Sequence, residues 1–270
     1  MIILRADGGL CNKLSVIGSG KFLAEQLGVP VHVLWITDKH MENIFSELFE
    51  PDPSLHIHEI KLNSRIARRI YAELERMFFI AANPIAADFS HKEKFERMVE
   101  RTKGRGLLFY KTCERFRPFD NLDWLKQLPT TKAKIDKFAE LAEGAVGFHI
   151  RRTDHRDAIR CSPAALFYKK AEELIGENPE CKIFLSTDDD AIRADFKRRW
   201  PNNVTIRANV LSRTSDRGGD AIVDLFLLSK CSKIYGSFPS SFSLIASLIG
   251  KIPLEYVRVP NWLKVLRREV

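Results

Sequence analysis

Long apolar runs are missing from this sequence, and their absence excludes the common membrane-protein classes. Arg5 and Asp7 interrupt the N-terminal apolar run, so no signal-peptide core can form there. The most apolar late segment, "SFSLIASLIG" at 241–250, is about half the length that a transmembrane helix needs. We therefore expect a cytoplasmic protein that is at most peripheral to the inner face of the membrane.

Cysteine is also scarce, with five residues among 270. No two of them form a C-x-x-C pair, and no spacing matches a metal finger. An odd, scattered set is typical of free thiols in a reducing compartment. The sequence therefore predicts no disulfide framework and no structural zinc site.

Positive charge is in excess, with 43 Lys and Arg against 35 Asp and Glu and a formal net charge of +8. Such a balance indicates an anionic partner, whether nucleic acid, a phosphorylated small molecule or a membrane surface. No basic helix is interleaved with aromatic residues at the spacing of a nucleic-acid-binding module. We therefore expect no nucleic-acid partner.

Short β-type runs alternate with helical patterns along the chain, which predicts an α/β fold with parallel sheets. Strands are expected at 1–6, 29–35, 55–60, 106–112, 145–150, 182–187, 204–208 and 233–236. A proline- and turn-rich segment, 116–131, divides these runs into two groups. We predict two doubly wound, Rossmann-like lobes with a cleft between them, 1–130 and 131–257, followed by a C-terminal helix at 258–270.

Two helices could contact partners. In 64–80, four apolar residues recur at helical spacing, and we expect that face to pack inward while the arginines are solvated. A phosphate or membrane patch is the alternative use of these arginines. The four apolar residues of this face are Ile66, Ile70, Leu74 and Met77. The C-terminal helix is expected to cross back to the first lobe, and its basic and aromatic residues leave peripheral membrane contact as the alternative.

The first strand is followed by "DGGLCN", in which Gly8 and Gly9 precede a helix. Glycines at this place let main-chain amides approach an anion at a helix N-terminus, although a tight structural turn has the same pattern. The spacing is neither G-x-G-x-x-G nor a P-loop, so no dinucleotide or Walker-type ATP site is predicted.

A stronger signal is "GFHIRRTD" at 147–154, where an apolar strand ends in Arg151, Arg152 and Asp154. The guanidinium fork suits phosphate oxygens, and ligands of parallel sheets lie beyond the carboxyl ends of strands. We predict that at least one of these arginines binds an anion. An ion pair between lobes is the alternative.

Two further strand ends carry polar residues. The run Asp188–Asp190 could hold a divalent metal with a diphosphate, but helix capping by Asp188 or Asp189 together with a nucleotide contact is favoured. Ser237, Ser240 and Ser241 open a late helix and predict a second phosphate site. A Ser–His–Asp hydrolase is disfavoured because no G-x-S-x-G elbow is present.

In this order, "GGLCNKL", "GFHIRRTD", "IFLSTDD" and "DLFLLSKCSKIYGSFPSSFS" resemble the fucosyltransferase superfamily of GT-B glycosyltransferases. The pattern is closest to α-1,6-fucosyltransferases of the rhizobial nodulation type and is more distantly similar to α-1,2- and protein O-fucosyltransferases. The resemblance spans nearly the whole chain. It implies a GT-B-like fold and an inverting, metal-independent transfer of fucose from GDP-fucose to a glycan, with no cofactor, in the building of a polysaccharide or other glycan.

The resemblance also implies roles for individual residues. Arg151 would bind the diphosphate and stabilise the departing GDP, Arg152 would support it, and His149 and Asp154 would shape the pocket. The remaining matches are Gly8, Gly9 and Asn12 beside the β-phosphate, Asp188 and Asp189 near the nucleoside, Asp224 at guanine, and Ser240 on phosphate.

The general base for the acceptor hydroxyl is not identified, because no glutamate follows "RRTD" closely. Asp154, Asp157 and Asp7 are candidates, and a loose transition state would need little base. Two other functions stay open: transfer of another nucleotide sugar, assisted by a metal at Asp188–Asp190, and a non-catalytic protein that binds nucleotide or glycan.

Overall fold

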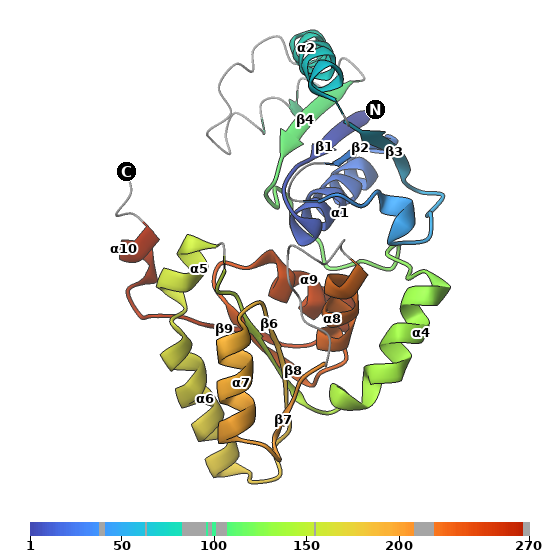
Figure 1. The fold of residues 1–270 in the computed structure, drawn as a ribbon. Helices are drawn as coiled ribbons and strands as arrows, with labels where there is room; N and C mark the ends of the chain where they lie inside the picture. The colour runs from blue at the N-terminus through green and yellow to red at the C-terminus, as the bar shows by residue number, and fades with distance from the viewer. Residues whose placement is uncertain are drawn as a thin grey trace. The chain divides into compact units, whose positions relative to one another are not determined.

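The computed structural model shows two compact units, Met1–Lys126 and Gln127–Val270 (Figure 1). Their boundary falls inside the segment 116–131 that the sequence marks as a linker. Each unit holds a parallel sheet, which confirms the predicted α/β class. The residues described are 1–37, 41–62, 64–82, 96, 99–100, 107–153, 155–207 and 219–266.

The first unit is built on a four-stranded sheet in the order β3-β2-β1-β4. All its strand pairs are parallel, and Ala6 lies opposite both Trp35 and Thr112. Every second residue of β1 is fully buried, as expected for a strand with one face on a core. The strands are β1 (Ile2–Ala6), β2 (Val31–Thr37), β3 (His56–Lys61) and β4 (Leu108–Thr112).

Two helices, α1 (Leu10–Leu27) and α2 (Arg65–Ala82), cover opposite faces of this sheet. A Cβ atom on Gly20 of α1 would lie 1.9 Å from a methyl carbon of Leu4, so α1 packs closely against β1. The next side chain along β1, Arg5, points the other way and pairs with Glu75 of α2. Successive side chains of a strand alternate between faces, so the helices form two separate layers. A short 3₁₀ helix, Phe45–Glu47, precedes β3.

The prediction that the apolar face of 64–80 packs inward is wrong. Its four residues are exposed, with 73% of Ile66, 57% of Ile70, 48% of Leu74 and 64% of Met77 accessible to solvent. The sheet side of α2 instead carries Tyr71 and Glu75, which contact Arg5. Polar and aromatic contacts, rather than apolar burial, therefore decide which side of α2 faces the sheet.

The second unit contains a five-stranded sheet in the order β7-β6-β5-β8-β9. All of its strand pairs are parallel, so β5 lies between β6 and β8 with its carboxyl end beside theirs. The strands are β5 (Val146–Ile150), β6 (Ile183–Thr187), β7 (Val204–Thr205), β8 (Lys233–Ser237) and β9 (Leu254–Val257). The ends of the predicted strands differ from those of β5 to β8 by a few residues, and β9 was not predicted.

Helices cover both faces of the second sheet (Figure 1). Phe148 of β5 contacts the rings of Phe167 in α6 and Phe196 in α7, while the adjacent Gly147 faces Leu228 of α8. A Cβ on Gly250 would lie 2.0 Å from the carbonyl oxygen of Ser229, so α8 and α9 also touch closely. The helices are α4 (Pro129–Phe138), α5 (Arg156–Cys161), α6 (Ala164–Glu177), α7 (Asp190–Arg199), α8 (Gly219–Ser229) and α9 (Ser241–Gly250), with a 3₁₀ turn at Ala139–Leu141.

The predicted C-terminal helix is present as α10 (Trp262–Leu266) and contacts α5 of the same unit. Arg160 of α5 donates a hydrogen bond to the carbonyl oxygen of Val265 at 2.5 Å. All five cysteines are free thiols, as predicted. Within the described residues, no helix combines the length and apolar character needed to cross a bilayer.

Candidate functional site

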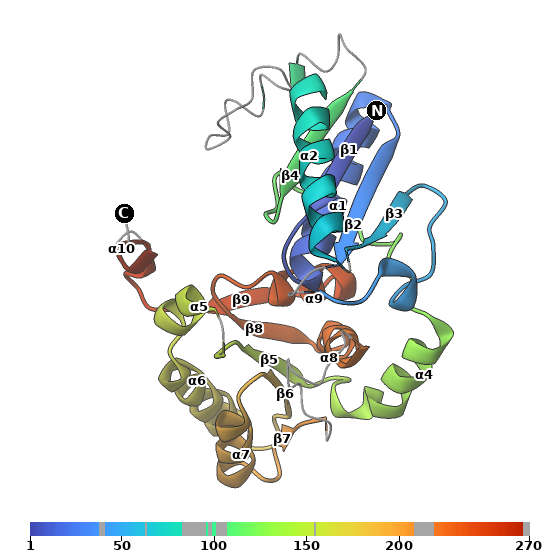
Figure 2. The ribbon, with the colours of Figure 1, turned by 45° about the horizontal axis from the view of Figure 1, so that its top comes forward.

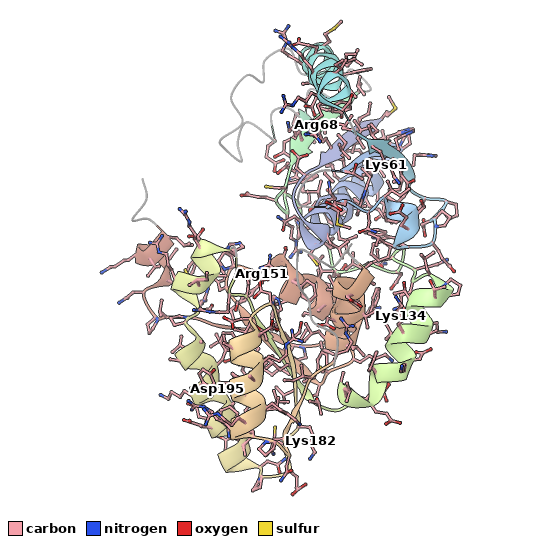
Figure 3. The ribbon with its side chains drawn as sticks, viewed as in Figure 1. Lys61, Arg68, Lys134, Arg151, Lys182 and Asp195 are labelled. Carbon is pink, nitrogen blue, oxygen red and sulfur yellow. The ribbon has the colours of Figure 1, made fainter. Side chains whose placement is uncertain are left out.

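Three neighbouring strands of the second unit end in the polar segments singled out from the sequence. The loop after β5 holds Arg151 and Arg152, the turn after β6 holds the aspartates, and β8 ends at Ser237. Because parallel strands bring their carboxyl ends to one edge, these segments meet at the edge where such sheets bind ligands. Figure 3 labels Arg151 at this edge. The joint placement predicted for them within this unit is therefore observed.

Asp188 organises the loop that follows β5. Its carboxylate accepts hydrogen bonds from the main-chain nitrogens of Arg152 at 2.7 Å and Thr153 at 3.4 Å, and from Thr153 Oγ1 at 2.7 Å. Nε of Arg151 lies 3.3 Å from Asp188 Oδ2, and only 8% of the Asp188 side chain is exposed. Asp188, predicted near a nucleoside, thus orients both arginines of the loop.

The same loop is held from the other side by β8. The main-chain nitrogen of Arg151 donates to Oγ of Ser237 at 3.0 Å, and Ser237 is fully buried. The Arg151 side chain keeps 21% of its surface exposed. Ser237 therefore acts inside the protein on the arginine backbone, and the guanidinium is the more accessible part of this constellation.

His149 lies buried beneath this edge, with 5% of its surface exposed. Its Nδ1 is 2.8 Å from Oγ of Ser243, and its ring stacks on Phe242 with centroids 4.7 Å apart. Burial, and then the nearby charge of Arg151, lower the pKa of His149 to about 3. A neutral, packed imidazole supports the strand end and does not exchange protons near neutral pH.

The start of α9 carries the other predicted serines. Ser240 is the N-cap residue, in an extended conformation, and its side chain makes no capping hydrogen bond. Ser241 is the first residue of the helix. The N-terminus of α9 follows β8 after a short turn, so its main-chain amides lie at the carboxyl edge of the sheet, and a helix N-terminus favours anions.

The three consecutive aspartates have different environments. Asp189 caps α7, accepting from the main-chain nitrogens of Ala191 at 2.9 Å and Ile192 at 3.1 Å, so the capping alternative is confirmed for this residue. Asp190 keeps 72% of its side chain exposed, 3.6 Å from Arg193. In the described part of the chain, no group of three His, Cys, Asp or Glu side chains converges so as to hold a metal ion.

Asp224, predicted at guanine, is a buried ion-pair partner. Its Oδ1 accepts from Nε of Arg207 at 2.5 Å and its Oδ2 lies 3.3 Å from Oγ of Ser186. The Arg207 guanidinium also donates to Oδ1 and to the carbonyl oxygen of Asp220, at 3.0 Å each. Both oxygens of Asp224 thus have partners inside the unit, and its contact with a base stays a prediction.

In the first unit, the loop after β1 places Gly8, Gly9 and Asn12 at the start of α1. Gly8 has φ +83°, in the region that favours glycine, and a Cβ there would lie 2.8 Å from Nδ2 of Asn12. Gly9 caps α1 with open space around its Cα. The structure therefore gives this loop a tight glycine turn at the start of α1; its contact with a phosphate stays a prediction, as does the cleft between lobes.

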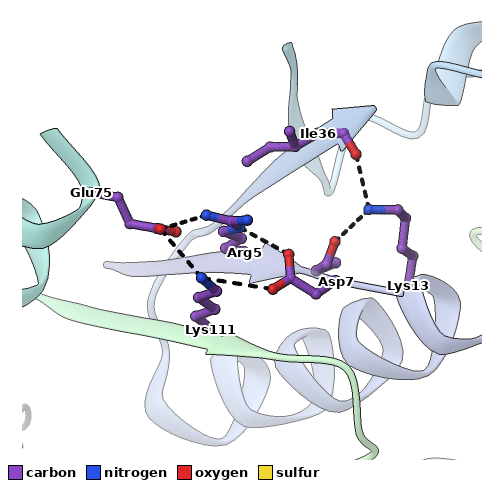
Figure 4. A network of polar contacts seen from close by, with 7 residues as sticks. Arg5, Asp7, Lys13, Ile36, Glu75 and Lys111 are labelled. Atoms are coloured by element: carbon purple, nitrogen blue, oxygen red, sulfur yellow. Dashed lines mark hydrogen bonds and ion pairs between the residues drawn. The ribbon is translucent and has the colours of Figure 1, made fainter. Parts of the chain in front are cut away.

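Asp7 belongs to a network of charges at the same end of β1 (Figure 4). Its Oδ1 accepts from Nε of Arg5 at 2.8 Å, and its Oδ2 is 3.9 Å from Nζ of Lys111. Glu75 pairs with both of these cations. Nearby, the fully buried Lys13 donates to the carbonyl oxygens of Ala6 at 2.6 Å and Ile36 at 3.0 Å. Asp7 is thus a partly buried carboxylate whose charge is balanced by two neighbouring cations.

One of the two other base candidates lies in α5. Asp157 is in the first turn of that helix, with 42% of its side chain exposed and Arg160 3.9 Å away. Asp154 lies outside the described residues. The sequence pattern gave no role to Thr153, Ser243 or Arg207, which the structure brings into contact with the predicted residues. Ser243 could have been found from its spacing, because it lies one helical turn after Ser240.

Comparison with known proteins shows similarity in structure only. No family model matches the sequence, and no curated protein matches it. Among solved structures, NodZ α-1,6-fucosyltransferase soaked with GDP-fucose superposes with a TM-score of 0.61 at 17% identity, over 92% of each chain. POFUT1 in its apo form gives 0.59 at 11% identity, covering 96% of this chain and 98% of the other.

A structure of POFUT1 in complex with GDP-fucose is similar as well, with a TM-score of 0.57 at 12% identity over 95% of this chain and 97% of the other. The chain therefore has the fold of the GT-B fucosyltransferases, which confirms the fold expected from the sequence. Likenesses at such low identity establish the fold and leave the activity to be argued from the site.

Proposed function

We propose that the protein is a glycosyltransferase that transfers fucose from GDP-fucose to a glycan acceptor, with inversion and without a metal ion. The observation that carries this proposal is the anchored loop after β5: Asp188 and Ser237 hold its backbone, and Arg151 is presented at the ligand-binding edge. In a fold shared with proteins solved with GDP-fucose, that edge suits a nucleotide diphosphate.

The proposed chemistry needs stabilisation of the leaving group. The bond between C1 of fucose and the diphosphate oxygen breaks, a bond from the acceptor oxygen to C1 forms on the opposite face, and the acceptor proton passes to a base. Negative charge then collects on GDP. A preorganised guanidinium and the N-terminus of α9 would stabilise that charge without waiting for solvent to reorganise.

Two contacts support an electrostatic role for Arg151. Its backbone nitrogen is bonded to a fully buried hydroxyl, and its Nε lies beside a nearly buried carboxylate. Each contact restricts the directions available to the side chain, so less conformational entropy is lost when a ligand binds. Removing one donor of this kind from an enzyme typically costs about 10²–10³ in kcat.

Thermal unfolding in the presence of nucleotides tests the donor. GDP, UDP, CMP and ADP are compared, each with Mg²⁺ and with EDTA. A ligand at about 100 times its Kd adds roughly 2.7 kcal/mol to the stability of the binding unit. Stabilisation by GDP that persists in EDTA supports the proposal. Stabilisation by UDP alone, or only with Mg²⁺, would instead favour another nucleotide sugar or a metal-assisted transferase.

Arg151→Ala, with Arg156→Ala as its matched control, tests the site. Both remove one arginine from the same loop–helix region, but Arg156 is an exposed residue of α5. We expect Arg151→Ala to abolish the GDP shift and Arg156→Ala to preserve it. Donor turnover, followed as GDP release from GDP-fucose with a panel of glycans, completes the test. GDP binding without turnover would indicate a non-catalytic binding protein.

A further inference from the structure

The helix α2, whose ribbon lies beside the sheet of the first unit in Figure 2, exposes its most apolar side to solvent. Five large side chains form this exposed side, which we call the α2 stripe. They are Ile66 at 73% exposed, Ile70 at 57%, Leu74 at 48%, Met77 at 64% and Phe78 at 54%. Their spacing places them along one side of the helix. Contiguous exposed apolar surface of this kind marks an interaction site more often than chance.

Contacts on the opposite side keep the stripe facing outward. Glu75 pairs with Arg5 and lies 3.4 Å from Nζ of Lys111, and only 12% of its side chain is exposed. The guanidinium of Arg5 also lies 5.5 Å from the centroid of the Tyr71 ring. Turning the stripe inward would break this network, so the stripe is a stable feature of the surface.

Arginines border the stripe. Arg65, Arg69 and Arg76 follow at intervals of four and seven residues, which places them in one row along the helix. Arg65 and Arg69 are exposed and make no ion pair with any described residue, while Arg76 pairs with Glu73. Arg68, also exposed, donates to the carbonyl oxygen of Leu62 (Figure 3). With four arginines against two glutamates, α2 is a basic amphipathic helix.

We propose that the α2 stripe and its arginines form a docking surface for an anionic lipid bilayer. A helix of this type lies in the plane of the interface, with its apolar side among the acyl chains and its cations at the phosphates. The arginines decide the occupant, because attraction between basic residues and anionic lipids adds to the burial of the apolar residues. Since α2 also carries six charged residues, it lies on the bilayer and does not span it.

This surface is separate from the C-terminal helix, for which the sequence left membrane contact open. Trp262 of α10 packs against Phe238, with ring centroids 4.6 Å apart, and under the guanidinium of Arg258 at 4.4 Å. Its aromatic side chain is therefore engaged within the second unit. Leu263, 51% exposed, is the large apolar residue that α10 offers to solvent, and it supplies a matched control.

The test is sedimentation of the full chain with vesicles. Phosphatidylcholine vesicles are compared with vesicles that contain about 30% phosphatidylglycerol. The variants are a stripe triple, I66Q/I70Q/L74Q, an arginine double, R65Q/R69Q, and the control L263Q. Glutamine is used because it is a good helix former and keeps α2 helical.

We expect the wild type to bind the anionic vesicles and to dissociate as salt is raised. The stripe triple should bind at least roughly ten-fold more weakly, the arginine double should lose the preference for anionic lipid, and L263Q should bind like the wild type. Loss of binding in L263Q alone would assign the contact to α10. Absence of vesicle binding in the wild type would overturn the proposal.

Two further outcomes would also overturn it. If the wild type is a dimer and the stripe triple is a monomer by analytical ultracentrifugation, a second copy of the chain covers the stripe. If the triple lowers the midpoint of thermal unfolding by more than a few degrees, another part of the chain covers it. A membrane surface predicts an unchanged midpoint, because the substituted side chains are already exposed.

Discussion

Asp7 in the first unit and Asp188 in the second both follow a strand end of a parallel sheet, yet they have different partners. Asp188 accepts from two main-chain nitrogens and one hydroxyl, and its side chain is 8% exposed. Asp7 accepts from the Arg5 side chain, lies near Lys111, and is 25% exposed. One carboxylate shapes a loop, and the other balances charge between neighbouring side chains.

This difference predicts how each strand end responds to substitution. Losing a nearly buried carboxylate that accepts three hydrogen bonds costs more than losing a partly exposed ion pair. The loop after β5, which Asp188 holds, should therefore be sensitive to loss of that carboxylate, and the end of β1 should tolerate loss of Asp7.

Asp188→Ala should have the largest effect on stability. It removes the acceptor of Arg152 N, Thr153 N and Thr153 Oγ1 together, and we expect a loss of about 3 kcal/mol. Hydrogen exchange followed by mass spectrometry should show amides of 151–153 exchanging roughly 100-fold faster. The control is Asp190→Ala, which removes the same charge from an exposed side chain and should change stability by less than about 0.5 kcal/mol. Equal effects of the two variants would contradict the role given to Asp188.

His149 should make the second unit sensitive to acid. Burial and Arg151 lower its pKa from 6.5 to about 3, so the unfolded chain binds a proton between these values and the folded chain does not. Stability is therefore constant above pH 6.5 and falls as the pH drops toward 3, by at most about 1.4 kcal/mol per pH unit from this residue.

Calorimetry at several pH values checks this expectation. Between pH 7 and 5 the wild type should lose about 2 kcal/mol more than His149→Asn, whose side chain does not titrate. The comparison with the variant removes the contributions of other histidines, including His155, whose pKa is also lowered by burial. Identical pH dependence in the two proteins would show that His149 titrates normally.

The strands of both sheets could be predicted from the sequence except for β9, and the buried face of one helix could not. Short β-branched runs separated by turns predicted the strands because burial on both sides of a parallel sheet demands them. Helical spacing correctly grouped Ile66, Ile70, Leu74 and Met77 on one side of α2, but it does not state which side the sheet takes. There, Arg5 within a strand and Glu75 within a helix decide the outcome, and a pair 70 residues apart leaves no periodic trace.

For the candidate site, residue type and position at strand ends located Arg151, Arg152 and Asp188. Most of the partners were not predictable, because Asp188 accepts from main-chain N–H groups, which every residue except proline has and which carry no sequence signal. Likewise, the contact between His149 and Ser243 depends on the pairing of β5 with β8, which lies beyond a local pattern.

Asp189→Ala should have an intermediate effect. The carboxylate caps α7 through two main-chain nitrogens, and loss of such a cap typically costs about 1 kcal/mol. Asp189→Ser restores a capping oxygen without the charge and should recover most of the loss. Urea unfolding followed by circular dichroism measures both. A loss in Asp189→Ala as large as in Asp188→Ala would mean that the two aspartates act as one unit.

Asp7→Asn should change stability least, by less than about 1 kcal/mol, because its ion pairs are partly exposed and Glu75 remains to balance Arg5 and Lys111. That small cost makes the variant a clean test of catalysis. If Asp7 takes the proton of the acceptor, fucose transfer should fall by about 10²–10⁴ while GDP binding and the unfolding midpoint stay near wild type. Asp157→Asn is the matched comparison, since it removes a similarly paired carboxylate from the other unit. Whichever variant loses transfer but keeps GDP binding identifies the base, and unchanged transfer in both would direct the search to Asp154 or to a transition state that needs little base.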